Sequence, residues 1–275
     1  MTSALALALL LAGPTSPKEI PWEKNFDEAM KKAEEHNMPV LIDFWAEWCG
    51  WCHRLDRTTY VDPLVVGKAQ NFVALKIDTE GSRLEREVTE RYKVNGLPTI
   101  LFLSPGGLQV KRVDSFMGPG QFPFVMDEAF EAAQRVYAWE VELVRDPNDA
   151  AALASIGHHL FEQKCYEESE EYLAHAADHD SDRPVDERRR TRLLLALLQN
   201  AKRHFAEAET LIKEALTLDP EAEDQPKLLF FLGSTYVSWG RHEMGVATMQ
   251  VIVREHPRSP IAQRAQETLV TLERK

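Results

Sequence analysis

The fold of this chain follows from one short segment, Asp43-Phe44-Trp45-Ala46-Glu47-Trp48-Cys49-Gly50-Trp51-Cys52-His53. A strand-forming run at residues 40–45 leads into two cysteines separated by two residues, and a helical pattern follows them. Cys49 is therefore expected at the start of a helix, where backbone N–H groups and the helix dipole favour a thiolate. Two cysteines at this spacing and junction can form a readily reduced disulfide. We interpret the pair as a reactive dithiol rather than a structural crosslink.

The residues around the cysteines resemble the thioredoxin family. Trp45-Ala46-Glu47-Trp48-Cys49-Gly50-Trp51-Cys52 is similar to that family's active site, and Asn95-Gly96-Leu97-Pro98-Thr99 is similar to its cis-proline loop. The order of strands and helices matches over residues 22–135. Cys-Gly-Trp-Cys, Leu55-Asp56 and Asp62-Pro63 resemble one branch most, the periplasmic thioredoxin-like domain of membrane thiol:disulfide interchange reductases and its soluble relatives. The resemblance implies an α/β thioredoxin fold.

A zinc site is the alternative interpretation of the two cysteines, because C-x-x-C is also a metal-ligand spacing. The third cysteine, Cys165, is far along the chain and supplies no second pair. Redox chemistry is the better interpretation, so we expect no metal and no cofactor beyond the Cys49–Cys52 disulfide.

The hydrophobic pattern of the first half alternates between helices and strands, which predicts a mixed central sheet with helices on both faces. Asn25 and Ser82 have the residue type and spacing of helix N-caps. Ser104-Pro105-Gly106-Gly107 is typical of a hairpin turn. The expected elements are strands at 40–45, 72–78, 99–103 and 108–113, and helices from 25 to 37, from the cysteines to about Tyr60, at 65–70, at 83–92 and from 121.

Disulfide exchange proceeds through thiolate attack and a mixed disulfide. Cys49, at the helix start, is expected to attack, and Cys52, one turn further, to resolve the mixed disulfide. Asp43 lies in an otherwise apolar strand, where burial raises the pKa of a carboxyl. The resemblance implies that Asp43 accepts the proton of Cys52. The position aligned with a lysine common in the family is Ala74, but Lys76 is on the same strand face and is a partial substitute.

The resemblance also implies a substrate-binding rim around the cysteines. Pro98, in the cis form, faces them and keeps a coordinating metal out, and the Leu97 backbone pairs with an extended substrate. The residues assigned to substrate binding are Trp48, Gly50, Trp51, Leu97, Thr99, Met117 and Gly118.

The second half changes character after Asp146, because only helical patterns follow. Tyr166, Phe205 and His242 begin three similar segments at intervals of 39 and 37 residues, each with a small residue three positions on and an apolar residue seven positions on. These segments resemble the tetratricopeptide repeat, whose period is about 34 residues. A plain helical bundle is the alternative. A last helix at 260–274 is expected to cover the open end.

Charge and length narrow the function classes. The 275 residues suffice for about two domains, and a net charge of −12 argues against nucleic-acid binding. Ala4 to Ala12 is an apolar run of signal-peptide size, although no basic residue precedes it. The predicted parts are a signal peptide at 1–16, a thioredoxin-like domain at 17–145 and helical repeats at 146–275. The chain is expected in the periplasm without stable membrane insertion, or in the cytoplasm if the run is no signal.

The function predicted from these features is a thiol:disulfide oxidoreductase of the reductase or isomerase type. Its expected partners are proteins with thiols or disulfides, an upstream electron donor, and proteins recruited by the repeats. An apolar inner groove of the repeats would bind them, lined by Ala154, Phe161, Leu193, Leu197, Phe230 and Val237. A chaperedoxin-like holdase, binding unfolded clients through the repeats, is the first alternative. A passive scaffold with a relic dithiol is the second.

Overall fold

The computed structural model describes residues 19–272, so the predicted export signal lies outside the described residues. The chain forms two compact units, one up to Tyr137 and one from Ala138 onward. The division falls inside a single helix, α5 (Phe122–Arg145), whereas the predicted domain boundary lies at the end of that helix, after residue 145. Each unit has its own buried core.

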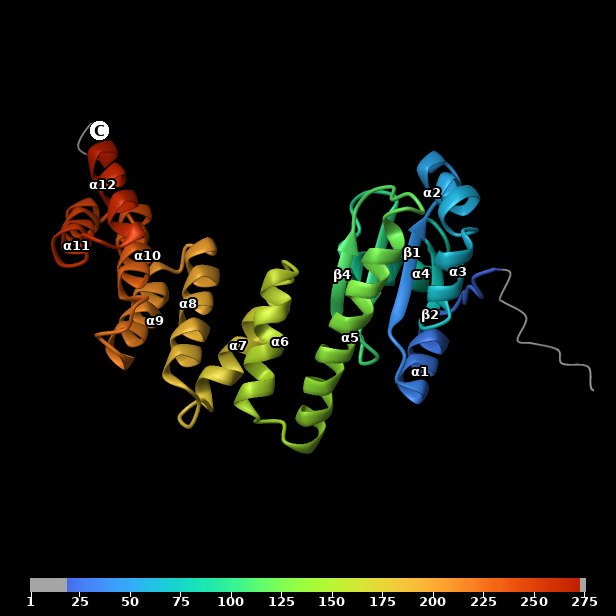
Figure 1. Ribbon diagram of the computed structural model, residues 1–275, viewed down its shortest axis with the longest axis horizontal. Helices are drawn as coiled ribbons and strands as arrows, with labels where there is room; N and C mark the ends of the chain where they lie inside the picture. Colours follow the sequence, from blue (N-terminus) through green and yellow to red (C-terminus); the bar gives the residue numbers. More distant parts are fainter. Residues whose placement is uncertain (1–18, 273–275) are drawn as a thin grey trace, which may run out of the picture. The chain divides into compact units, whose positions relative to one another are not determined.

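The first unit is built on a four-stranded sheet in the order β2-β1-β3-β4 (Figure 1). The strands are β1 (Val40–Trp45), β2 (Val73–Asp78), β3 (Thr99–Leu103) and β4 (Gln109–Val113). β1 pairs parallel with β2 and antiparallel with β3, and β4 is antiparallel to β3. The predicted mixed sheet is confirmed. Because of these directions, the C-terminal ends of β1, β2 and β4 meet the start of β3 at one end of the sheet.

Helices cover both faces of this sheet, as predicted. α1 (Phe26–His36) and α4 (Arg83–Arg91) share one apolar cluster with alternate residues of β1, β2 and β3. On the other face, the ring of Phe102 lies 6.1 Å from that of Phe122 on α5. An ion pair between Lys68 and Asp127 joins α5 to α3 (Pro63–Ala69) there. The two caps are also confirmed: Asn25 accepts from the Glu28 N–H, and Ser82 and Glu85 form a capping box.

The helix after the cysteines differs from the prediction. An α-helix extends only over α2 (Gly50–Arg54), and a π-helical turn, η1 (Leu55–Thr59), continues it. The wider turn buries Leu55 and Thr59 while Asp56 stays half-buried beside Lys76 on β2. A π turn is an insertion that periodicity alone does not reveal, and such turns are frequent at functional sites.

The second unit is all-α, with three helix pairs and a last helix. The pairs are α6 (Ala150–Glu162) with α7 (Tyr166–Asp178), α8 (Val185–Ala201) with α9 (Phe205–Leu218), and α10 (Gln225–Ser238) with α11 (His242–Glu255). The three marker residues found in the sequence are the first residues of α7, α9 and α11. α12 (Pro260–Leu272) packs on α11 through an apolar cluster. The tetratricopeptide-like architecture is confirmed.

Small residues let the helices of a pair approach closely. A Cβ on Gly157 would lie 2.7 Å from the Leu173 side chain, and a Cβ on Gly245 would lie 3.1 Å from the Gly233 carbonyl oxygen. The Ser169 hydroxyl also donates to the Gly157 carbonyl oxygen at 2.8 Å. The recurring small residues are therefore required by the packing within each pair.

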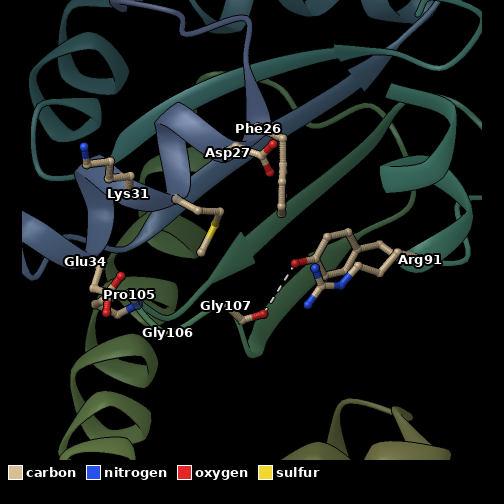
Figure 2. A pocket seen from close by; sticks show the side chains of 10 residues that line it. Phe26, Asp27, Lys31, Glu34, Arg91, Pro105, Gly106 and Gly107 are labelled. Atoms are coloured by element: carbon tan, nitrogen blue, oxygen red, sulfur yellow. Dashed lines mark hydrogen bonds between the residues drawn. The ribbon is translucent and has the colours of Figure 1, made fainter. Parts of the chain in front are cut away.

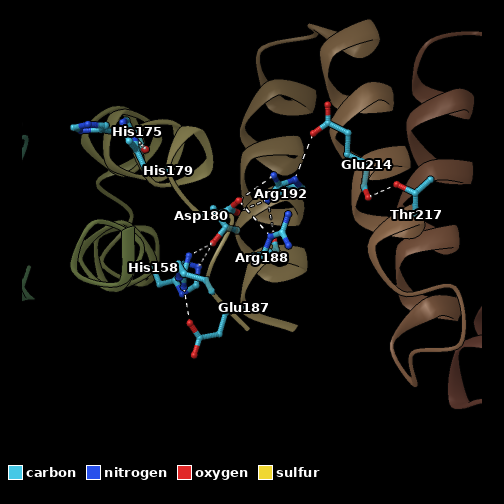
Figure 3. A network of polar contacts seen from close by, with 11 residues as sticks. His158, His175, His179, Asp180, Glu187, Arg188, Arg192, Glu214 and Thr217 are labelled. Carbon is cyan, nitrogen blue, oxygen red and sulfur yellow. Dashed lines mark hydrogen bonds and ion pairs between the residues drawn. The ribbon is translucent and has the colours of Figure 1, made fainter. Parts of the chain in front are cut away.

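The predicted apolar groove is wrong for two of its residues. Ala154 and Leu193 are buried in the helical cores and line no open surface. Charged side chains join α8 to the loop before it and to α9 (Figure 3). In this network the buried Asp180 accepts from Arg192 at 2.5 Å, and Arg192 also lies 3.4 Å from Glu214. Ionic contacts thus connect α8 with the preceding loop and with its partner helix α9.

Arg189 of α8 forms a further ion pair, with Asp224 just before α10. It is 1% exposed and donates to the carbonyl oxygens of Ala215 and Asp219 at 2.8 and 2.6 Å, at the end of α9. Arg189→Met is expected to lower the free energy of unfolding by about 3 kcal/mol, because these acceptors lose their donor. Urea unfolding of the full chain, followed by helical circular dichroism, measures the change.

Arg190→Met is the matched control for this variant, because the neighbouring Arg190 is exposed and pairs at the surface with Glu162 at 3.4 Å. Its effect should stay below about 1 kcal/mol, as for other surface ion pairs. Equal effects of the two substitutions would contradict the role given to burial.

Candidate active site

The two cysteines form a disulfide at the junction of β1 and α2. The Cys49 sulfur caps α2 and accepts from the Cys52 backbone N–H at 3.1 Å. The residues are 3% and 1% exposed, so burial hardly distinguishes them. What distinguishes Cys49 is its position at the helix start, where an N–H group points at its sulfur. A thiolate is favoured in such a position.

The Leu97–Pro98 peptide bond is cis and directly precedes β3, at the same end of the sheet as Cys49. Leu97 is half-buried. Thr99 is 1% exposed, and its hydroxyl donates to the Gly96 carbonyl oxygen at 2.8 Å. Because its side chain is buried, Thr99 can make the predicted substrate contact only through its backbone. The substrate pairing assigned to Leu97 and the position of Pro98 facing the cysteines stay predictions.

Two predicted rim residues are large and open to solvent. Trp48 is 67% and Trp51 is 53% exposed, and the indole N–H of Trp48 donates to the Glu80 carboxylate at 2.8 Å. Apart from the adjoining backbone, no atom of residues 19–272 lies within 4 Å of a Cβ built on Gly50 or Gly118, so space adjoins both glycines.

A loop after β4 completes this side of the site. The Met117 carbonyl oxygen accepts from the buried Thr59 hydroxyl at 2.8 Å, which fixes the loop to η1. The neighbouring Phe116 places its ring centroid 5.4 Å from that of Trp51. Sequence reasoning missed Phe116, although it adjoins the predicted Met117. It also missed Arg54, whose spacing of three from Trp51 puts both on one helix face.

Asp43 is fully buried on the sheet face that carries the helix of the cysteines. Lys76 is its register partner on β2, and Lys76 Nζ lies 3.3 Å from Asp43 Oδ2. Burial raises the pKa of Asp43 to about 6, while the charge of Lys76 and then the nearby Tyr60 hydroxyl oppose the rise. Neither carboxylate oxygen meets hydrogen-bond geometry with a partner among the described residues. The carboxyl is thus poised to exchange a proton near neutral pH.

Lys76 is held in a cage of aromatic rings. Its Nζ lies 5.2 Å from the ring centroid of Trp22, 5.8 Å from that of Trp45 and 5.5 Å from that of Tyr60. It also contacts the half-buried Asp56 on η1. Lys76 thus links the buried Asp43 to a carboxylate that reaches solvent. The predicted contact of Lys76 with Asp43 is present, whereas Asp56, Tyr60 and Trp22 were missed, because the π turn and the fold bring them there.

Replacement of Lys76 gives the second testable prediction. Lys76→Met should raise the pKa of Asp43 above its value of about 6, because the main opposing charge is lost. The pH dependence of mixed-disulfide release should move to higher pH with it. The ¹³C shift of the Asp43 carboxyl, followed by NMR through a pH titration, measures the change directly. Lys68→Met, which removes a lysine paired with Asp127 elsewhere, is the control and should leave the profile unchanged.

Other features of the described residues do not add to this site. A hollow lies at the opposite end of the sheet, beside the β3–β4 turn, and contains none of the predicted site residues (Figure 2). Within residues 19–272, no group of three or more potential metal-ligating residues occurs. The helices of that part of the chain also include none long and apolar enough to cross a membrane.

Comparison with known families identifies the first unit. Residues 21–105 match a family model described as "Thioredoxin-like". The chain is 34% identical over 100 residues to the "Thiol:disulfide interchange protein DsbD 1" of Pseudomonas aeruginosa, which covers 34% of this chain and 17% of that relative. It is 33% identical over 113 residues to "Thiol:disulfide interchange protein DsbD" of Haemophilus influenzae, covering 40% of this chain and 20% of that protein. Residues 21–105 of the first unit are thus similar to the thioredoxin-like family.

A solved structure titled "DsbH Oxidoreductase" is also similar, with a TM-score of 0.39 and 20% identity, over 46% of this chain and 95% of that one. The chain spans a fifth or less of the length of the two curated relatives above. The match of the family model to residues 21–105 and the mixed sheet confirm, for the fold, the resemblance inferred from the Cys49 and Pro98 motifs.

Proposed function

We propose that the chain is a thiol:disulfide oxidoreductase that exchanges disulfides of proteins through Cys49 and Cys52. The observation that carries this proposal is the Cys49–Cys52 pair at the end of β1, above a buried Asp43 whose pKa is about 6. The names of the relatives support it, since both are thiol:disulfide interchange proteins.

The reaction conserves electrons and protons. In the reducing direction, the Cys49 thiolate attacks a client disulfide, forms a mixed disulfide and releases one client thiolate. The Cys52 thiolate then attacks Cys49, which closes the Cys49–Cys52 disulfide and releases the second client thiolate. Two electrons pass to the client, and the two thiol protons end on the two client sulfurs. An upstream dithiol must then reduce Cys49–Cys52 again.

Asp43 is proposed to take the proton of Cys52 in the second step. Near neutral pH, a carboxyl with a pKa of about 6 is largely ionised and can accept a proton, and it binds that proton more tightly than an ordinary carboxylate does. Lys76 and Asp56 form the route by which the proton reaches solvent.

Reduction of insulin by the full chain, with dithiothreitol as the electron source, tests the proposed activity. Precipitation of the insulin B chain should be faster with the chain than with dithiothreitol alone. The equilibrium of Cys49–Cys52 with glutathione gives its redox potential and separates a reductase from an isomerase or oxidase. No acceleration, with the cysteines shown to be reducible, would leave only a scaffold with a relic dithiol.

The partners and the location are further parts of the proposal. The helical unit is proposed to recruit partner proteins, and the apolar run of residues 4–12 supports export to the periplasm.

A further inference from the structure

Two flanks of opposite charge lie on either side of the disulfide. The strand order β2-β1-β3-β4 places β2 and β4 on opposite sides of the central pair, and both end at the edge of the sheet where Cys49 lies. Glu80 follows β2, and Phe116 follows β4. A client cysteine joined to Cys49 would therefore have one flank on each side.

The flank beside β4 carries a fixed cation. The guanidinium of Arg54 lies 5.2 Å from the ring centroid of Trp51 and 5.0 Å from that of Phe116. Stacking on two rings restricts this side chain, because a planar guanidinium is attracted to aromatic faces. Arg54 is exposed, and no carboxylate of residues 19–272 lies within ion-pair distance of it. The Arg54 guanidinium is therefore available to bind the carboxylate of a client.

The flank beside β2 is acidic. The Glu80 carboxylate accepts the indole N–H of Trp48, which leaves its negative charge at the surface next to an exposed ring. Glu47, just before Trp48, is also exposed. The two tryptophans around Cys49 therefore present different charges: Trp48 lies with a carboxylate and Trp51 with a guanidinium.

We propose that this asymmetry selects protein clients that carry an acidic side chain close to their reactive cysteine, on the side that meets Arg54. The proposal rests on the proposed disulfide exchange and names the substrate class of the same site. An Asp or Glu there binds the guanidinium in a bidentate way, whereas the same residue on the other side meets Glu80 and Glu47. The whole chain carries a charge of −12 and so repels acidic clients in general. The local cation of Arg54 therefore determines which acidic segments bind beside Cys49.

Disulfide-linked homodimers of a short blocked peptide test this directly. The peptide has a central cysteine and either Glu or Gln, placed just before it in one pair of peptides and just after it in another. The full chain is reduced, and its single-turnover oxidation by each peptide is followed after acid quenching and alkylation. At low salt, Glu is expected to raise the rate constant about three- to tenfold over Gln at one of the two positions only. High salt should diminish the difference.

Arg54→Gln should abolish this preference, and Arg54→Lys should keep part of it. Arg57→Gln is the matched control, since Arg57 is an exposed arginine of η1 without a ring contact or ion pair among the described residues. A preference that survives in Arg54→Gln, or equal rates for all peptides, overturns the selection by Arg54 and leaves the activity standing. If no peptide oxidises the chain faster than background, the proposed function itself fails.

Discussion

Cys52→Ala is expected to retain the first attack on a client disulfide and to accumulate a mixed disulfide that does not turn over. The Cys49 sulfur lies at the helix start and receives an N–H group, so its thiolate needs no help from Cys52. The second step has no nucleophile in this variant. Incubation of the reduced variant with a client disulfide, followed by non-reducing mass spectrometry, should show one adduct per chain, mapped to Cys49.

Cys49→Ala is expected to reduce insulin no faster than dithiothreitol alone and to form no such adduct, because the attacking sulfur is missing. Cys165→Ala is the control that keeps both active-site sulfurs, since Cys165 lies at the start of α7 in the second unit. Its rate should equal that of the unchanged chain. An adduct on Cys52 in the Cys49→Ala variant would reverse the roles assigned to the two cysteines.

Asp43→Asn is expected to make the oxidised chain more stable at neutral and alkaline pH, by about 3 kcal/mol. The pKa of Asp43 is about 6 in the folded chain against 3.8 for the ordinary group, and each pH unit between them corresponds to about 1.4 kcal/mol. The folded state therefore binds this proton more tightly than the unfolded state. The ionised Asp43 carboxylate therefore lowers the free energy of unfolding. This loss is nil below pH 3.8, grows as the pH rises to about 6 and is constant above that.

The test is urea unfolding of both chains at acidic and alkaline pH, followed by tryptophan fluorescence of the first unit. The Asp43→Asn chain should be more stable only on the alkaline side. Because Asn accepts no proton, release of the mixed disulfide should also slow more than its formation. Equal stability of both chains at alkaline pH would show that the carboxyl is not penalised by burial. Equal slowing of both steps would remove Asp43 from the proton transfer.

The sequence predicted best what depends on local pattern. The caps at Asn25 and Ser82 and the strand before Cys49 are each encoded within a few neighbouring residues, and the helix starts at Phe205 and His242 follow from a pattern that recurs along the chain. Such signals need no knowledge of what packs against them.

What the sequence did not predict depends on segments far apart in the chain. Phe116 meets Arg54 only because β4 ends beside α2, and Asp56 meets Lys76 only because η1 widens by a residue. The apolar groove was assigned from helical periodicity, which marks a face as apolar without telling whether another helix covers it. Ala154 and Leu193 are covered in this way.

The contact between Lys76 and Asp43 has a consequence for how this site tolerates change over evolutionary time. Leu41 pairs with Ala74 and Asp43 with Lys76, so positions 74 and 76 face the same side of β2. A basic side chain that moves by two positions along the strand keeps its acidic neighbour, whereas a move by one transfers it to the opposite side of the sheet. Evolution must therefore keep the basic residue on this face of β2, which every second position of the strand provides, but need not keep it at one fixed position. Related chains with an alanine at one of these two places should therefore carry the amine at the other.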